Sequence, residues 1–449
     1  MHVTEPARTI PVVENVDICV VGGSCTGVFA AARAARLGAS VAIVEKQNCF
    51  GGMATAGFVN IWHSLYGERG GPQIIAGMTL EMIERLEARG AVAPVGGVCY
   101  RFNSEELKIE LDEVVRSHGM SAYLHSYFAA PWVDEGDLKG VIIENKDGRQ
   151  AIAAAMVIDA TGDGDVARAM GCESYLDGTL QPPTPCCKLH GMDSLGDWNW
   201  EEAVNEHGAE FGLEEDWGWH CVIPDIPELE MHADTHVFNV NASKAADLTY
   251  AEMEGRRQIR AIQDVIRTYG PADAKVGLAG LAATIGIRET DRIKARYRLT
   301  GEDVLHGTAF DDAIAFGSYR VDIHHSEGPG ITFRYLDGTE RIIPGRGKPE
   351  QVGRWREKTE TNPTYYQIPY RCLVQDRFPN LLLAGRMLDA DKTAFSAVRV
   401  MVNTNQTGEA AGVAAWLALH SNSSIQDVDV AKVRALLTEG GSLIVDAGS

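Results

Sequence analysis

The sequence lacks the features that mark several broad classes of protein. Positive charge is scarce, because 41 Lys and Arg residues stand against 62 Asp and Glu residues and the net charge is −21. Binding to nucleic acid or to an anionic membrane needs a basic surface, so we expect neither partner. No stretch reaches the roughly 20 apolar residues of a membrane-spanning helix. Residues 1–16 contain no apolar segment typical of a signal peptide. We therefore expect a cytoplasmic protein.

Metal-binding and disulfide signatures are also missing. The nine cysteines are scattered, and no C-x-x-C pair has zinc-site spacing. We expect reduced thiols and no metal site, because the acidic pair Asp311-Asp312 has no further ligands at suitable spacing and is typical of a solvated turn. With 449 residues, the chain is long enough for two or three domains.

The stretch DICVVGGSCTGVFAAARAARLGASVAIVEK, residues 17–46, predicts a β-α-β unit. An apolar strand over 17–21 precedes glycines, an alanine-rich helix over 28–37 follows, and a second strand covers 40–44. This almost matches the dinucleotide signature G-x-G-x-x-G, but Ser24 replaces the second glycine. Glu45 stands where an acid commonly binds a ribose hydroxyl. The unit predicts nucleotide binding; the alternative is a structural strand–turn–helix in another α/β protein.

The residues after Glu45 indicate which nucleotide binds. Gly51 and Gly52 begin six residues after Glu45, where an NAD enzyme would normally continue into another helix and strand. A glycine turn lets backbone lie against a flat ring system, which favours FAD. No second signature for a nicotinamide cofactor is present, although an NAD-binding regulatory protein stays an alternative.

Three further stretches carry a resemblance to a known family: residues 157–171, residues 281–328, which contain IRETDR and VDIHH, and residues 365–418, which contain LLLAGR. With the N-terminal unit, they resemble FAD-dependent oxidoreductases distantly related to fumarate reductase flavoproteins. The resemblance implies an α/β fold with noncovalent FAD. We expect a Rossmann-like, glutathione-reductase-like FAD domain made discontinuously from residues 12–75, 100–180 and 372–449. Residues 181–371 would form an inserted α+β substrate or cap domain.

The resemblance also implies which residues hold FAD, from the pyrophosphate loop to the last helix, which we expect to open at 404–408. These residues are Gly22, Gly23, Ser24, Cys25, Thr26, Gly27, Glu45, Lys46, Gly51, Gly52, Met53, Ala160, Thr161, Gly162, Gly385, Arg386, Gln406, Thr407 and Gly408. The sequence departs from the family in two places. Asp291 precedes Arg292 where a second arginine is usual, and residues 182–188 read PPTPCCK instead of an apolar run.

Candidate catalytic residues follow from charge in apolar surroundings. Arg288 and Arg292 would share one face of a helix as a cationic clamp for a substrate carboxylate or for flavin O2; the alternative is an ion pair with Glu289, Asp291 or Asp312. His324 shares a strand face with Asp322, which predicts acid–base chemistry, and His325 is second choice. Arg399 and Arg371 lie in apolar segments, so each needs an anionic or carbonyl partner.

Other residues support weaker interpretations. Cys186-Cys187 suggests a redox role, although the usual C-x-x-C pattern is absent. Cys49 or His63 offers a route to covalent flavin attachment. The cap carries Trp198, Trp200, Trp217 and Trp219, which suit a hydroxylated or ring-containing substrate.

The sequence as a whole predicts an enzyme that dehydrogenates or reduces a small polar organic molecule by hydride transfer at flavin N5. Two alternatives stay open: a monooxygenase or oxidase that uses molecular oxygen, and a flavin-binding protein without redox turnover. The sequence identifies neither the electron acceptor or donor nor the oligomeric state.

Overall fold

A seven-stranded sheet organises the computed structural model, which describes residues 1–96 and 99–445. The sheet has the order β6-β2-β1-β9-β8-β7, and β22 also pairs with β9. Its strands are β1 (Val12–Val21), β2 (Val41–Val44), β6 (Ser121–Tyr123), β7 (Tyr127–Asp134), β8 (Asp137–Asn145), β9 (Gly148–Asp159) and β22 (Leu381–Leu383). β6, β2, β1, β9 and β22 run parallel, whereas β7 and β8 are antiparallel to their neighbours. The apolar runs of β1 and β2 are buried, as expected for parallel strands covered on both faces.

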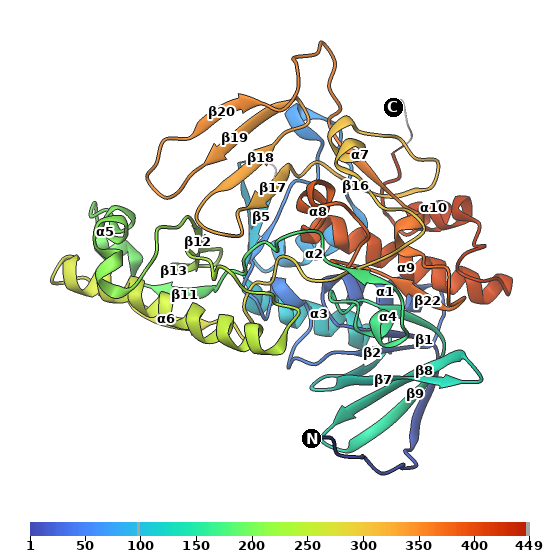
Figure 1. Cartoon of the computed structure of the whole chain (residues 1–449). Coiled ribbons are helices and arrows are strands. Elements are labelled where there is room, and N and C mark those ends of the chain that lie inside the picture. Colours follow the sequence, from blue (N-terminus) through green and yellow to red (C-terminus); the bar gives the residue numbers. More distant parts are fainter. Residues whose placement is uncertain (97–98, 446–449) are drawn as a thin grey trace.

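Strand β9 belongs to both parts of this sheet. One edge pairs with β1, while the other edge pairs first with β8 over residues 148–153 and then with β22 over residues 157–159. The strand β22 thus completes the parallel part of the sheet from the far end of the chain (Figure 1).

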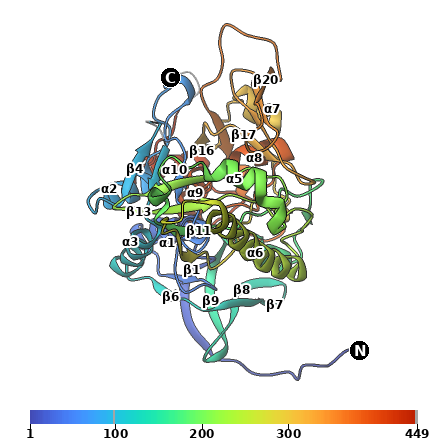
Figure 2. The same cartoon turned by 90° about the vertical axis from the view of Figure 1, so that its left-hand side faces the viewer.

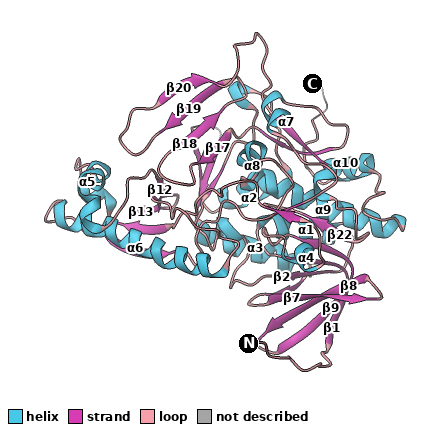
Figure 3. Cartoon of the chain, in the orientation of Figure 1, coloured by secondary structure: helices cyan, strands magenta, loops and turns pink. Residues whose placement is uncertain are grey.

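Helices α1 (Cys25–Arg36) and α9 (Met401–Ser421) pack against each other beside the sheet. Alanines buried in both helices allow their backbones to approach closely, and Gly412 faces the Ala30 carbonyl. In Figure 3, α1, α3 and α9 lie between the large sheet and the β17–β20 sheet. The remaining α-helices are α2 (Gly77–Glu87), α3 (Ser104–Ser117), α4 (Asp165–Ala169), α5 (Trp200–His207), α6 (Ala245–Tyr269), α7 (Gly301–His306), α8 (Lys392–Val398) and α10 (Val430–Glu439).

Two four-stranded sheets lie on different sides of the molecule (Figure 1). One contains β11 (Cys187–His190), β12 (Trp219–Ile223), β13 (Ile226–Ala233) and β14 (Gly277–Leu281). Apolar residues of α5 and α6 cover this sheet, and Figure 2 shows α6 alongside β11. The other contains β17 (Val321–His324), β18 (Ile331–Arg334), β19 (Thr339–Ile343) and β20 (Gln351–Arg354).

Three smaller sheets connect these parts. Their strands are β3 (Ile61–Trp62), β4 (Val92–Val95) and β5 (Cys99–Phe102), then β10 (Ser174–Tyr175) with β15 (Arg292–Ile293), and β16 (Ala313–Gly317) with β21 (Tyr366–Pro369). The mixed α/β class and its parallel sheet agree with the sequence prediction. The division into an FAD domain and a cap stays a prediction, and residues 446–449 of its last segment lie outside the described residues.

Local patterns predicted several elements correctly, with shifted ends. The strand expected from residue 17 begins at Val12, and the helix expected from residue 28 begins at Cys25. The amphipathic pattern at 108–116 lies within α3, where Leu111 is fully buried. Residues 121–133 form two strands, β6 and β7, because His125 between them adopts a left-handed backbone conformation with φ of 51°.

The helix expected to align Arg288 with Arg292 does not form. Residues 287–291 are irregular, and Arg292 begins the short strand β15. Arg292 is fully buried, forms ion pairs with Glu289 and with Asp177 (3.1 Å), and lies over the Phe395 ring. Arg288 and Arg292 therefore do not lie on one face of a helix.

Candidate functional site

The carboxyl ends of the parallel strands open into a cavity of about 610 Å³, called the main cavity below. Gly22 follows β1, Glu45 follows β2, Ala160 follows β9, and Gly385 lies two residues after β22; all four line it. Ligands of open α/β sheets bind at this end of the strands. The predicted FAD residues that line the cavity are Gly22, Ser24, Cys25, Thr26, Glu45, Lys46, Gly51, Gly52, Met53, Ala160, Thr161, Gly162, Gly385 and Arg386.

The glycine turn explains why Ser24 is tolerated. Gly22 has φ of 102°, and a Cβ atom there would lie 2.4 Å from the Ala160 carbonyl oxygen. At Gly27, a Cβ atom would lie 1.8 Å from the Gly22 carbonyl oxygen, so both positions require glycine. Ser24 instead has φ of −61° and caps α1 in an extended conformation that any residue adopts.

This turn fits a pyrophosphate. Ser24, Cys25 and Thr26 form the N-terminus of α1 at the cavity wall. The first N–H groups of a helix have no acceptor within the helix, and the helix dipole favours negative charge there. Gly23 and Gly27 do not line the cavity; they allow the turn to form behind it.

The carboxylate of Glu45 fixes the neighbouring loop. It accepts hydrogen bonds from the Gly23 N–H (2.7 Å) and from the Gln47 N–H (2.8 Å). An ionised carboxylate offers about four acceptor positions. Glu45 therefore keeps acceptor capacity toward the cavity, as an adenosine ribose requires.

Arg386 neutralises a buried acid where β9 and β22 end. Its guanidinium forms an ion pair with Asp163, which also accepts a hydrogen bond from the Thr290 hydroxyl at 2.7 Å. Burial raises the pKa of Asp163, but the Arg386 charge outweighs burial and the net pKa lies below its usual value. This ion pair joins the ends of two strands at the cavity wall.

The last long helix begins earlier than the sequence suggested. α9 opens at Met401 instead of 404, and Met401, Thr404 and Asn405 line the cavity. Gln406, Thr407 and Gly408 lie outside the lining. They shape the wall, because Thr407 accepts a hydrogen bond from the Gly385 N–H (3.1 Å) and Gly408 packs on the Thr26 carbonyl.

Charged side chains gather at the other end of the main cavity. Asp322 and His324 come from β17, Tyr319 and Arg320 precede that strand, and Arg399 follows α8. Arg399 Nη2 lies 3.2 Å from Asp322 Oδ2, which also accepts a hydrogen bond from the Tyr319 hydroxyl at 2.7 Å. Arg399 thus has the anionic or carbonyl partner that its apolar surroundings predicted, because it contacts both the carboxylate and the carbonyl of Asp322.

Arg288 reaches this end of the cavity from its irregular segment. It donates hydrogen bonds to the Pro182 carbonyl (2.8 Å) and to the Thr184 hydroxyl, which are both neutral. The predicted ion pairs with Glu289, Asp291 or Asp312 are not its contacts. Burial and the nearby Arg399 charge together lower the pKa of the guanidinium to about 10. A buried cation with neutral partners favours an anionic ligand.

The charge balance at this end is positive. Arg288, Arg320 and Arg399 line the cavity around a single carboxylate, Asp322. Burial raises the pKa of Asp322, but the positive charges of Arg399 and Arg320 outweigh it and hold the pKa below its usual value. Arg320 lies over the Phe333 ring, and its Nε is buried without a hydrogen-bond partner.

His324 is held by contacts at both ring nitrogens. Nε2 lies 3.2 Å from Asp322 Oδ1, as the shared strand face predicted, and Nδ1 lies 2.8 Å from Nε2 of His236. Burial and the Arg288 charge hold the pKa of His324 well below its usual value, so the ring is neutral. His325 points elsewhere, toward the Thr332 hydroxyl at 2.9 Å, and does not line the cavity.

Comparison with known protein families identifies the group to which the chain belongs. A family model described as FAD dependent oxidoreductase matches residues 17–437. The chain belongs to the FAD-dependent oxidoreductase family. FAD is its cofactor, and it is an oxidoreductase enzyme. No curated protein matches the sequence significantly.

Solved flavoprotein structures are similar to this oxidoreductase only distantly. A geranylgeranyl bacteriochlorophyll reductase-like protein from Thermoplasma acidophilum is 14% identical with a TM-score of 0.47, covering 95% of this chain and 84% of that one. A triple mutant of a flavin-dependent brominase is 11% identical with a TM-score of 0.46, at 95% and 84% coverage. The p-nitrophenol 4-monooxygenase of Pseudomonas putida is 10% identical with a TM-score of 0.43, at 96% and 81% coverage. Within the described residues, no helix is long and apolar enough to cross a membrane.

Several residues of the oxidoreductase cavity escaped the sequence analysis. These residues are Tyr319, Arg320 and Asp163. The ring of Tyr319 lies against that of His63, tilted by 33° with centroids 4.1 Å apart. Arg320, Asp322 and His324 are spaced two residues apart, so in a strand their side chains share one face, and this spacing could have identified Arg320. Of the four cap tryptophans, Trp217 and Trp219 line the cavity; Trp198 and Trp200 pack in the cluster beneath α5 and α6.

Other candidates lie away from the chemistry. Cys186 lines the cavity, but Cys187 packs into a different apolar cluster, so the two thiols do not act on one site. Burial raises the pKa of Cys186 to about 12, which leaves an unreactive thiol. Cys49 does not line the cavity, whereas His63 does. Arg371 is exposed and pairs with Asp312 at 2.9 Å, so its expected partner is structural.

Among the described residues, one group has metal-ligand composition: His220, His232 and Asp234, whose ligand atoms lie within 4.8 Å of one another. His232 Nδ1 lies 2.9 Å from Asp234 Oδ2, as in an ordinary ion pair. The two imidazole rings stack at 14° with centroids 5.2 Å apart. Lone pairs in nearly parallel stacked planes do not converge on one ion, and we assign no metal to this group.

Proposed function

We propose that this oxidoreductase dehydrogenates a small hydroxy acid, or reduces the corresponding oxo acid, with His324 as the proton acceptor or donor. One observation carries the proposal: a single cavity joins the predicted FAD residues to three arginines and one histidine–aspartate pair. Hydride transfer from a hydroxyl-bearing carbon requires a base for the hydroxyl proton and an anchor for the substrate.

The residues that would hold FAD are divided along the cavity. The N-terminus of α1 would bind the pyrophosphate, and Glu45 would bind the adenosine ribose. Gly51 and Gly52, with φ of 106° and 55°, would bring backbone against the flavin ring. The N-terminus of α9 would face the pyrimidine side, where its free N–H groups stabilise negative charge. When bound, FAD supplies the acceptor for a hydride at N5.

The arginines would recognise the carboxylate of the substrate. Arg288 and Arg320 have no carboxylate partner among their described hydrogen bonds and ion pairs, so they are free to bind one from the substrate. Arg399 is already paired with Asp322 and would position that acid.

The pair of His324 and Asp322 would manage the proton. Nε2 of a neutral His324 takes the proton of the substrate hydroxyl, and the Asp322 carboxylate at 3.2 Å stabilises the imidazolium that forms. In the reducing direction, the same nitrogen returns a proton to the carbonyl oxygen. Both side chains are at least nine-tenths buried, so a bound substrate would exclude water from them.

The visible absorption spectrum of the FAD-loaded protein tests this proposal. Under anaerobic conditions, we expect bleaching of the oxidised flavin by one member of a 2-hydroxy acid series such as glycolate, lactate, malate and mandelate. Matched alcohols that lack the carboxylate should be ineffective. Bleaching by neutral alcohols or sugars at equal rates would refute carboxylate recognition, and a flavin that no compound reduces would favour a non-redox protein. Admission of air then reports on oxygen use.

Substitution of Arg288 sharpens the test. Arg288→Met removes a charge-assisted contact worth about 1.5–3 kcal/mol, so KM for the acid should rise at least about tenfold. Arg371→Met is the matched control, because Arg371 is exposed and remote from the cavity lining. Equal KM values for the two variants would contradict an anchoring role for Arg288.

A further inference from the structure

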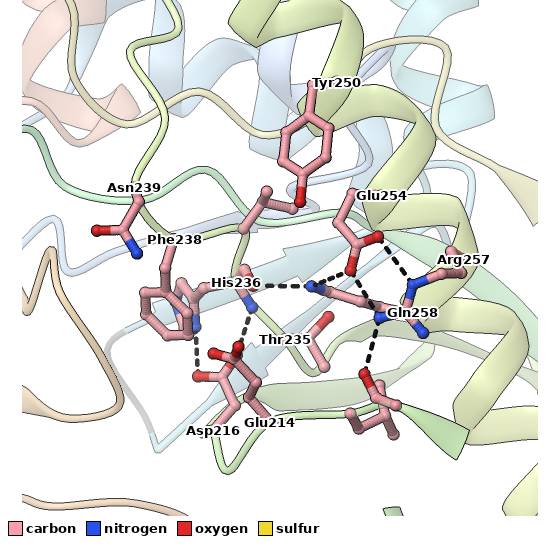
Figure 4. Close-up of a pocket in the computed structure, with 13 residues that line it drawn as sticks. Glu214, Asp216, Thr235, His236, Phe238, Asn239, Tyr250, Glu254, Arg257 and Gln258 are labelled. Atoms are coloured by element: carbon pink, nitrogen blue, oxygen red, sulfur yellow. Dashed lines mark hydrogen bonds and ion pairs between the residues drawn. The ribbon is translucent and has the colours of Figure 1, made fainter. Parts of the chain in front are cut away.

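Two cavities of this oxidoreductase meet at a wall made of two histidines. His324 lines the main cavity, and His236 lines a second cavity of about 450 Å³ between residues 212–216, residues 235–239 and helix α6. Figure 4 shows this second cavity, with His236 and Asp216 joined by a dashed line. Its floor is buried, whereas rim residues such as Glu214, Tyr250 and Arg257 are exposed. The second cavity therefore reaches solvent.

A continuous chain of four side chains crosses the wall. Asp216 Oδ1 lies 2.8 Å from His236 Nδ1, and His236 Nε2 lies 2.8 Å from His324 Nδ1. His324 Nε2 then lies 3.2 Å from Asp322 Oδ1 in the main cavity. The exposed fractions of the four residues are 7%, 4%, 5% and 5%, so bulk water does not separate them.

Hydrogen-bond chemistry fixes the protons along this chain. Asp216 accepts from the His236 backbone N–H as well, so it is an ionised acceptor and Nδ1 of His236 carries a proton. Burial lowers the pKa of His236 despite the Asp216 charge, which leaves its Nε2 unprotonated. His324 must then donate from Nδ1, and its own Nε2 is bare. The one open proton position therefore lies at the main-cavity end, beside Asp322.

We propose that the chain Asp322–His324–His236–Asp216 conducts protons between the main cavity and the second cavity. The proposal rests on the proposed function of His324. A proton taken up by His324 Nε2 displaces the Nδ1 proton onto His236 Nε2, and the His236 Nδ1 proton passes to Asp216. The carboxylic acid then gives a proton to water in the second cavity. One proton leaves one cavity and one appears in the other.

The surroundings explain why such a path is needed. FAD and substrate in the main cavity exclude water, so a proton held there has no direct acceptor. An imidazolium at His324 would face Asp322 but also the Arg288 charge, and at His236 the Asp216 charge favours an imidazolium while the Arg288 charge opposes it. Transfer through both rings leaves no added charge in this buried region. Glu254 is paired with Arg257, so the proton acceptors at the second cavity are Asp216, which ends the chain at His236, and the exposed Glu214 at the rim.

His236 and Asp216 are thus positioning residues that act through His324, and a substrate-independent assay tests them. The full-length FAD-loaded protein is photoreduced without air and mixed with ferricyanide in weak buffer containing a pH-indicator dye. Two ferricyanide ions take the two electrons and no proton, so the one proton of the anionic reduced cofactor must leave through the protein. The return of flavin colour reports electron transfer, and the dye reports proton release.

We expect the two signals to coincide in the wild type. In His236→Ala, colour should return at the wild-type rate, while proton release slows by about tenfold or more. Imidazole should enter from the second cavity and restore release. 1-Methylimidazole fills the same space but cannot pass a proton from one nitrogen to the other, so it should not. Tyr250→Phe, at the rim of the second cavity, is the control and should match the wild type.

Proton release that still coincides with colour in His236→Ala would overturn the path, and so would equal rescue by both imidazoles. If the alanine variant fails to fold, His236→Gln provides the test, because its amide keeps hydrogen bonds but relays no proton; the same lag is expected. The assay needs no substrate. Failure of every hydroxy acid to reduce the flavin would therefore refute the proposed function without deciding the path.

Discussion

The variant Glu409→Gln tests how the two helices at the cofactor site are held together. Glu409 on α9 accepts hydrogen bonds from Arg33 Nε on α1 (2.8 Å), from the Met78 N–H of α2 (3.2 Å) and from the Ser442 hydroxyl beyond α10 (3.1 Å). Arg33 also donates to the Leu437 carbonyl of α10 at 3.2 Å. One ion pair thus joins four helices.

The expected cost follows from burial. The side chains of Arg33 and Glu409 are 4% and 1% exposed. Removing one charge of a buried pair leaves the other uncompensated, which costs about 3–5 kcal/mol. The matched control is Glu81→Gln, which weakens the ion pairs of Glu81 with Arg36 and Arg85; these three side chains are 28%, 29% and 33% exposed. Solvent-accessible pairs of this kind contribute less than about 1 kcal/mol each. The two variants should therefore differ by at least about 1 kcal/mol in the free energy of unfolding.

Urea unfolding of the FAD-free chain, followed by circular dichroism and tryptophan fluorescence, measures this difference. A double variant, Arg33→Met with Glu409→Leu, removes both charges and should be less destabilised than the sum of its single variants. The reasoning is wrong if Glu409→Gln lowers the free energy of unfolding no more than Glu81→Gln does, or if the double variant is simply additive.

Two further predictions concern residues of the cavity. Gly27→Ala would place a Cβ atom 1.8 Å from the Gly22 carbonyl oxygen, so the variant should lose FAD during gel filtration, whereas Gly353→Ala, with open space around its Cβ, should retain it. Burial and the Arg320 charge lower the pKa of His63 to about 3, below its unfolded value of about 6.5. The unfolded chain therefore binds an extra proton between these values, and stability of the FAD-free chain should fall as pH decreases through that window. His63→Asn should make the urea midpoint less pH-dependent there; an unchanged slope would contradict a neutral buried His63.

Sequence patterns correctly predicted the features that depend on residues close together in the chain. The β-α-β unit and its glycine turn depend on spacing over a few residues, and they formed close to the expected positions. The pairing of Asp322 with His324 also follows from strand alternation alone.

The features that depend on contacts between distant segments of the chain could not be predicted from such patterns. His236 meets His324 across 88 positions of sequence, and nothing around residue 236 indicates that partner. Arg292 follows Arg288 at helical spacing, but Glu289 and Asp177 bind Arg292 while the Pro182 carbonyl binds Arg288. These tertiary partners outweigh local helix preference. The family resemblance placed Gln406 at the cofactor, although its side chain hydrogen-bonds the Phe316 backbone.

The late arrival of β22 has a consequence for synthesis of the chain. Until residues 381–383 leave the ribosome, the end of β9 keeps an unpaired edge, and α1 lacks its partner α9. Exposed strand edges and apolar helix faces promote association between unfinished chains. The nascent protein must therefore wait for its last segment before its first nucleotide-binding unit is complete. Premature termination anywhere before β22 would give an aggregation-prone product instead of a smaller flavoprotein.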